Sequence, residues 1–103
     1  MEIKQYQQQA YTTATETSRN IYYMTMGLAG EAGEIANKVK KVMRDSRVID
    51  REDLAKEIGD VLWYVAGICT VLDLDLNDVA EANLKKLADR KARGVISGSG
   101  DNR

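Results

Sequence analysis

Two stretches of the chain share one pattern, and this pattern decides the fold that we predict. Residues 28–39 read LAGEAGEIANKV, and residues 54–65 read LAKEIGDVLWYV. Both follow Leu-Ala-x-Glu-x-Gly-acid-β-branched-x-x-x-Val. Each stretch carries two carboxylates three residues apart, which are Glu31 and Glu34 in the first and Glu57 and Asp60 in the second. These repeated acid pairs are the first candidates for a functional site.

Helical periodicity places each acid pair at the border of an apolar stripe. Residues three apart lie on one face of an α-helix, one turn from each other. The stripe begins at Leu28 in the first stretch and at Leu54 in the second, and it continues at the usual spacings of three and four residues. The acids take the same two edge positions in both helices. If the two stripes pack together, four carboxylates meet at one border of the helix pair.

Four carboxylates at one border favour a bound cation. Like charges repel, and partly buried charges also lose hydration, so a cation would relieve both costs. The chain has no histidine, and oxygen ligands alone predict a hard ion, Mg²⁺ with Mn²⁺ as a substitute. Gly33 and Gly59 each cost about 1 kcal/mol relative to alanine in a helix, and we expect them to permit close approach of the helix backbones. Acids on solvated helix faces are the alternative that spacing leaves open.

Length and composition predict one small domain. The chain has 103 residues, 44% of them hydrophobic and 30% charged, and its net charge is −1. A core of this size is modest, so oligomerisation would help it. A net charge near zero provides no overall electrostatic attraction to a nucleic acid polymer or an anionic membrane. The N-terminus lacks a signal-peptide core and the apolar run 61–72 is too short to span a bilayer, so we expect a cytoplasmic protein.

The pattern predicts an all-α fold, because the chain has no proline and no strand-turn-strand signature. Asp50 is a good N-cap, Cys69 is expected in the core, and Trp63 is expected to contact the first helix or a second subunit. We take residues 1–94 as the domain and residues 95–103 as a Gly/Ser-rich tail, mobile without ligand and able to close over a substrate. The expected helices are 3–18, 21–44, 51–72 and one that begins after Asp75 or Asn77 and ends near Arg93, with Gly94 next.

Basic side chains form a second candidate surface. Asn83, Lys86, Arg90 and Arg93 align on one face of the last expected helix. This face is either solvated and paired with acids or an anion site near the metal, suited to a polyphosphate. Two further cations, Lys38 and Lys41, are either i, i+4 partners of Glu34 and Asn37 or phosphate contacts. Arg103 and the backbone N–H groups of the tail could close over phosphates.

The motifs resemble the MazG family of nucleoside triphosphate pyrophosphohydrolases. The family pattern is E-x-x-E, a spacer, then E-x-x-D, and here GLAGEAGE at 27–34 is followed by EIGD at 57–60. The sequence NLKKL at 83–87 with Arg90 resembles the third family element, N-x-x-K-L-x-x-R. The resemblance covers most of the chain from Gly27 onward. The first 20 residues match only loosely, and that region helps to choose the base in this superfamily.

The resemblance implies a four-helix bundle-like, oligomeric protein with its substrate site near a subunit interface. It implies a homodimer or homotetramer that cleaves (deoxy)nucleoside triphosphates to the monophosphate and pyrophosphate. It also implies Mg²⁺ on the four acids. Among these acids we expect Glu31 and Glu34 to be catalytic carboxylates, with Glu34 orienting or deprotonating the water. Lys86 then has a catalytic role on the leaving pyrophosphate. The expected substrate contacts are Lys38, Lys41, Asn83, Lys86, Arg90, Arg93 and Arg103.

Three alternatives remain open at this point. A phosphoribosyl-ATP pyrophosphohydrolase and a dUTP/dCTP pyrophosphatase share the implied fold, and the sequence leaves the preferred base and sugar open. A non-enzymatic helical oligomerisation module would use the same acids as solvated groups paired with the basic face. The expected role of the enzyme is house-cleaning of the nucleotide pool.

Overall fold

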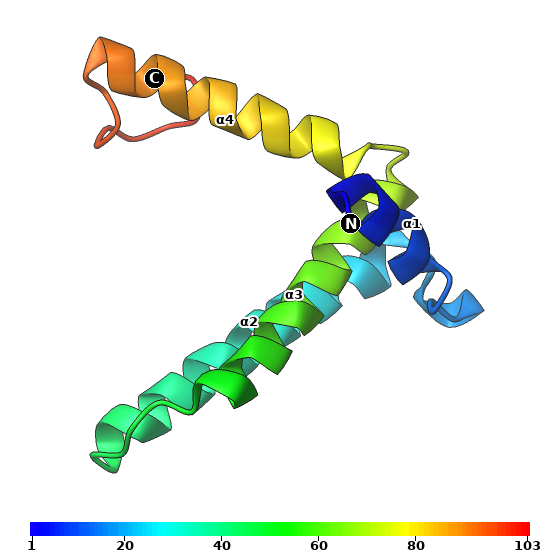
Figure 1. Ribbon diagram of the computed structural model, residues 1–103, viewed down its shortest axis with the longest axis vertical. Helices are drawn as coiled ribbons and strands as arrows, with labels where there is room; N and C mark the ends of the chain where they lie inside the picture. Colours follow the sequence, from blue (N-terminus) through cyan, green and yellow to red (C-terminus); the bar gives the residue numbers. More distant parts are fainter.

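The computed structural model describes all 103 residues and contains helices and no strands. This confirms the all-α class (Figure 1). No helix combines the length and the apolar character that a membrane crossing requires. The elements are α1 (Ile3–Tyr11), a single 3₁₀ turn (Glu16–Ser18), α2 (Ile21–Arg44), α3 (Arg51–Val71) and α4 (Leu76–Arg93).

Local capping chemistry sets the ends of the three long helices. The side chain of Asn20 accepts from the Tyr23 amide at 2.8 Å and begins α2. The predicted cap Asp50 accepts from the Asp53 amide at 3.1 Å and begins α3. Asp75 caps α4 in the same way, and Gly94 ends it with a φ of +70°, a left-handed conformation that glycine adopts without strain.

The first helix is shorter than predicted. The expected helix over 3–18 ends at Tyr11. The hydroxyls of Thr12 and Thr13 donate to the carbonyls of Gln9 and Ala10 at 2.6 and 2.7 Å, so these side chains hydrogen-bond the last turn of α1. Such local side-chain bonds compete with the helical ladder, and β-branched residues also disfavour it. A turn and the short 3₁₀ segment then lead into α2.

The body of the molecule is an antiparallel hairpin of α2 and α3, with α1 packed across one end of it (Figure 1). The core at this end joins Ala66 and the predicted core residue Cys69 to Leu76, the first residue of α4. Met24 of α2 is fully enclosed. Gln7 of α1 is also buried, and its side chain ties α1 to the turn between α3 and α4.

Helix α4 extends away from the α2–α3 hairpin as an arm (Figure 1). Beyond its first residue it packs mainly against α1. The radius of gyration is 16.4 Å, whereas a compact chain of this length would have about 13 Å. Large apolar side chains are exposed on the hairpin and on the arm, including Ile58 at 58% and Leu84 at 66%. The four predicted helices are therefore present, but a single chain does not close them into a bundle.

The glycines in the two acid motifs do not serve the purpose that we predicted. A Cβ atom built at Gly33 or Gly59 would meet nothing within 4 Å, so no helix backbone of the same chain approaches there. The close approaches occur at two other glycines. A Cβ at Gly67 would lie 2.5 Å from the Sδ atom of Met24, and a Cβ at Gly27 would overlap the ring of Tyr64.

Candidate active site

Three of the four motif acids meet across the α2–α3 hairpin. Glu31 comes from α2, and Glu57 and Asp60 come from α3. Each offers a carboxylate oxygen, and these oxygens all lie within 4.8 Å of one another. Oxygens this close together would be able to hold one divalent cation between them.

The electrostatics of this group favour a positive charge. Partial burial of Glu31 raises the pKa of its carboxyl group, and the charges of Asp60 and Glu57 raise it further. A raised pKa means that the folded chain stabilises the ionised form poorly. A divalent cation compensates this repulsion without protonating the acids. The donor set, three carboxylates with no nitrogen or sulfur, suits Mg²⁺ or Mn²⁺.

The structure leaves Glu34 outside this group. Its side chain is exposed, one turn along α2 from Glu31. A carboxylate in this place is not committed to the cluster and is free to contact a water molecule next to it. The assignment of Glu34 as a metal ligand or as the residue that activates water stays a prediction.

Lys38 pairs with acids of the opposite helix. Its Nζ atom lies 2.8 Å from Asp53 Oδ2 and 2.9 Å from Glu57 Oε1. These two hydrogen bonds raise the pKa of the Lys38 ammonium group. The intrahelical partner that we considered, Glu34, is not used. Glu57 is thus shared between an ion pair with Lys38 and the acid group that it forms with Glu31 and Asp60.

Two aromatic residues border the acids. Glu31 and Asp60 line an open hollow of about 300 Å³ together with Trp63 and Tyr64. The two rings meet edge to face, 4.9 Å between centroids. The Trp63 indole N–H donates to the Ala10 carbonyl at 3.1 Å and to the Thr13 hydroxyl at 2.9 Å. This confirms the expected contact of Trp63 with the first helix, and it fixes the aromatic wall beside the acids.

The basic residues of α4 lie apart from the acids of the same chain. Asn83, Lys86, Arg90 and Arg93 are carried by the arm, which diverges from the α2–α3 hairpin (Figure 1). We expected an anion site next to the metal, and a single chain does not bring the two groups together. Beyond Leu76, which packs on α3, the arm contacts mainly α1. A shared site would therefore need α4 from a second copy.

The other two predicted phosphate contacts have separate places in the fold. Lys41 is exposed and lines a hollow of about 260 Å³ at the far end of the hairpin, with Arg47 and Asp50 among its neighbours. Arg103 folds onto its own tail, where its guanidinium donates to the carbonyls of Val95 and Gly100 at 2.9 and 2.6 Å. Neither residue reaches the acid group in this structure. Their roles as substrate contacts stay predictions.

Sequence reasoning missed four contributors to these sites. Asp53 precedes Glu57 by one helical turn, so its spacing could have identified it as a neighbour of Glu57 on the same face of α3. Tyr64 follows Asp60 by one helical turn, so its spacing could have identified it as a neighbour of Asp60. Gly27 contributes because the absence of a side chain there leaves room for the Tyr64 ring. Asp101, which pairs with Lys86 and Arg90, lies in a tail with no periodic pattern. No signal in the sequence marked it.

Comparisons with known proteins identify the family of the chain. Residues 19–95 match the family described as the MazG nucleotide pyrophosphohydrolase domain. The matched range contains all the motif acids and the basic face of α4. The chain is also 54% identical over 92 residues to the protein "Gene 37 protein" of Mycobacterium phage L5, a match that covers 85% of this chain and 81% of the relative. No solved structure matches the chain.

Proposed function

The chain belongs to the MazG family of nucleotide pyrophosphohydrolase domains, and from this premise we propose that it hydrolyses (deoxy)nucleoside triphosphates to the monophosphate and pyrophosphate with Mg²⁺. Members of this family are hydrolases that act on anhydride bonds and typically depend on a divalent metal. The observation that carries the proposal is the convergence of Glu31, Glu57 and Asp60 within 4.8 Å. The role that fits such an enzyme is house-cleaning of the cytoplasmic nucleotide pool.

The residues present fit a divalent ion. Glu31, Glu57 and Asp60 would hold it, and partial burial together with repulsion from Asp60 and Glu57 raises the pKa of Glu31, a cost that the ion would offset. When bound, Mg²⁺ neutralises phosphate oxygens and lowers the pKa of a bound water. Mn²⁺, which accepts the same oxygen ligands, is the expected substitute.

The side chains of the chain have separate roles in the reaction. Glu34 orients the attacking water and accepts its proton, because it is exposed beside the acid group without belonging to it. The water oxygen forms a bond to the α-phosphorus, and the bridging bond between the α-phosphorus and the leaving pyrophosphate breaks. Lys86 and Arg90 stabilise the charge that develops on the pyrophosphate. The aromatic wall of Trp63 and Tyr64 borders the space for the rest of the nucleotide.

We propose that the complete site forms in a homo-oligomer. One chain carries the acids on its hairpin and the cations on a separate arm. Exposed apolar side chains on α2, α3 and α4 support contact with a second copy, because a monomer would leave them in water. The dimer would thus bring α4 of one chain over the acids of the other. Analytical ultracentrifugation tests the assembly, and Ile58→Glu should weaken it.

Mixing two inactive variants tests the shared site. Glu57→Gln removes a carboxylate, and Lys86→Ala removes a cation. If each site takes its acids from one chain and its cations from the other, a mixed dimer contains one intact site. After unfolding and refolding an equal mixture, we expect about a quarter of the wild-type turnover, because half of the dimers are mixed. No recovery of turnover would place both groups in one chain.

The reaction is tested by identifying the products. Canonical and modified nucleoside triphosphates are incubated with and without Mg²⁺, and products are separated as mono- or diphosphate. We expect the monophosphate plus pyrophosphate, only with metal. Glu57→Gln should abolish turnover, whereas Glu52→Gln, an exposed acid in the first turn of the same helix, should preserve it. Turnover that survives Glu57→Gln would reject this site.

The same substrate panel ranks the related reactions. Phosphoribosyl-ATP and dUTP or dCTP are the alternative substrates on the same fold. The first helix is the region expected to choose the base, and α1 contributes the carbonyl that holds Trp63 beside the hollow. A preference for one of these three compounds over the other triphosphates would replace the broad proposal with the narrower one.

A non-enzymatic oligomerisation module is the candidate from another class. Stabilisation by metal separates it from the enzyme. A ligand at one hundred times its dissociation constant stabilises the folded state by about 2.7 kcal/mol. We therefore expect Mg²⁺ to raise the free energy of unfolding of the wild-type protein but not of Glu57→Gln. A module with solvated acids would show no such difference.

A further inference from the structure

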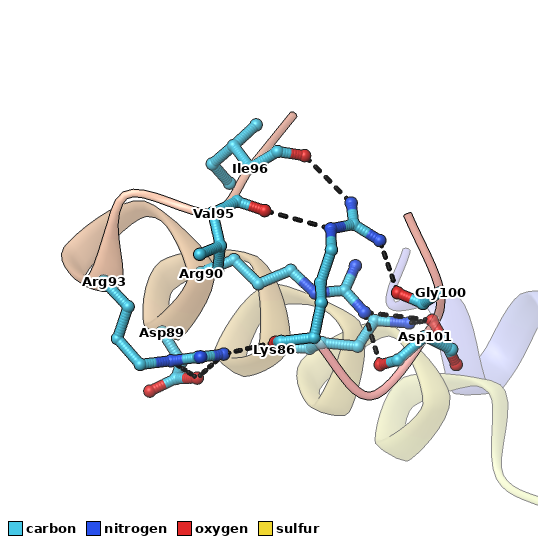
Figure 2. A network of polar contacts seen from close by, with 9 residues as sticks. Lys86, Asp89, Arg90, Arg93, Val95, Ile96, Gly100 and Asp101 are labelled. Carbon is cyan, nitrogen blue, oxygen red and sulfur yellow. Dashed lines mark hydrogen bonds and ion pairs between the residues drawn. The ribbon is translucent and has the colours of Figure 1, made fainter. Parts of the chain in front are cut away.

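The tail, residues 95–103, folds back along the basic face of α4 (Figure 2). The Asp101 carboxylate accepts hydrogen bonds from Lys86 Nζ at 2.9 Å and from Arg90 at 3.1 Å. Arg90 also donates to the backbone carbonyl of Asp101 at 2.5 Å. The two residues that we assign to the pyrophosphate group of the substrate are thus bound by a carboxylate of the same chain.

A network within the tail holds Asp101 in this position. The guanidinium of Arg103 binds three backbone carbonyls of the tail. That guanidinium donates to the carbonyls of Val95, Ile96 and Gly100 at 2.6–2.9 Å. Arg93 donates to the backbone oxygen of Arg103 at 2.6 Å. The tail therefore has a defined shape, and it places one anionic group against the cations of α4.

Burial is unequal across the ion pair between Asp101 and Arg90. The Arg90 side chain is only 6% exposed, whereas the Asp101 side chain is 80% exposed. The cation is therefore already covered by protein, and the anion lies at the solvent boundary. Lys86 and Arg90 both lower the pKa of the Asp101 carboxyl group, so the carboxylate stays charged at neutral pH. Arg90 is bound by both the carboxylate and the backbone carbonyl of Asp101, so release of the tail frees its guanidinium for another anion.

We propose that Asp101 is an internal competitor of the substrate: its carboxylate takes the place of a phosphate group on Lys86 and Arg90, and nucleotide binding requires its release. This inference rests on the proposed function, because it assigns the basic face of α4 to a polyphosphate. An anion that displaces Asp101 from Lys86 and Arg90 needs more negative charge than a single carboxylate carries. A triphosphate offers several charged oxygens to the same donors and forms more charge-assisted hydrogen bonds. The pyrophosphate product offers fewer charged oxygens than the triphosphate, so closure of the tail on Lys86 and Arg90 favours its departure.

Competition of this kind has a measurable size. The apparent dissociation constant of a ligand equals the intrinsic constant divided by the fraction of molecules whose site is free. Exposed ion pairs are individually weak, so we expect Asp101→Asn to tighten polyphosphate binding by about two- to fivefold. Asparagine preserves the size of the side chain and the backbone carbonyl that Arg90 uses. Glu81→Gln is the matched control, because it removes one negative charge from an exposed position of α4 that has no basic partner.

The experiment measures binding of inorganic tripolyphosphate to the full chain in metal-free buffer by calorimetry. We expect Asp101→Asn to bind tighter than wild type and Glu81→Gln to match wild type. Amide signals of Gly98 and Gly100 in nitrogen-15 NMR spectra report on the tail, and in the wild-type protein they should shift at saturating tripolyphosphate.

Several results would overturn the proposal. Weaker or unchanged binding by Asp101→Asn would mean that Asp101 arranges the cations and does not compete for them. If the amide signals of Gly98 and Gly100 do not shift at saturating tripolyphosphate, the phosphates bind elsewhere. Absence of tripolyphosphate binding to all three proteins would remove the anion site itself. Nucleotide turnover and its loss in Glu57→Gln are measured separately with metal, so failure of the tail mechanism is distinguishable from failure of the proposed enzyme.

Discussion

Replacement of Gly67 by alanine tests how tightly α2 and α3 pack. A Cβ atom at Gly67 would lie 2.5 Å from Sδ and 2.8 Å from Cε of Met24. Ordinary contacts between such atoms are about 3.5–4.0 Å, so one of the helices or the Met24 side chain must move by about 1 Å. Met24 is 0% exposed and has no solvent to move into. Overpacking of this kind costs about 1–3 kcal/mol, and it is partly offset by the helix propensity of alanine, about 1 kcal/mol.

The matched control is Gly30→Ala, because a Cβ there would meet nothing within 4 Å. Both variants gain the same propensity, so it cancels in their difference. We expect Gly67→Ala to be less stable than Gly30→Ala by about 1–3 kcal/mol, which is a gap of at least about 4 °C between thermal midpoints. Urea and thermal unfolding followed by circular dichroism at one protein concentration measure this gap. Equal stability of the two variants would refute the packing that we describe.

Three further changes have defined outcomes. Because the raised pKa of Glu31 makes the folded chain bind a proton more tightly than the unfolded chain, the contribution of Glu31 to metal-free stability should increase as the pH falls through the raised pKa, and urea titrations should show that Glu31→Gln removes this contribution. Gln7→Leu leaves the Leu76 amide and the Leu74 carbonyl without a partner, so unfolding should become easier by about 1–3 kcal/mol. Lys38→Met removes the cation beside Glu57, so calorimetry should show tighter Mg²⁺ binding while metal-free stability falls.

Local signals predicted the long helices well. The expected range 21–44 agrees with α2 (Ile21–Arg44), and the expected range 51–72 agrees with α3 (Arg51–Val71) to one residue. Both helices begin at a side-chain cap and continue with an apolar stripe, and both signals are visible in adjacent residues. The predicted helix over 3–18 was too long, because the hydroxyls of Thr12 and Thr13 bind the last carbonyls of α1 and the helix ends at Tyr11. Pattern reasoning gives too little weight to that competition.

The candidate site was predictable where it depends on equal helical phase. Glu31, Glu57 and Asp60 meet because both motifs present their acids at the same edge of a packed stripe. The partners of Lys38 were not predictable from spacing within one helix, because they lie on the opposite helix. The direction of α4 was also not predictable. It depends on hydrogen bonds between α1 and a turn more than 60 positions away, and such contacts leave no periodic signature.

The buried Gln7 side chain has a consequence for the order of folding. Its hydrogen bonds span 63, 67 and 69 positions in the sequence, whereas the α2–α3 hairpin is built from neighbouring segments. Closing a long loop costs more chain entropy than closing a short one, so contacts between nearby segments tend to form early. We therefore expect the hairpin to form first and α1 to dock late. The arm that carries the cations then acquires its direction only in the final step of folding.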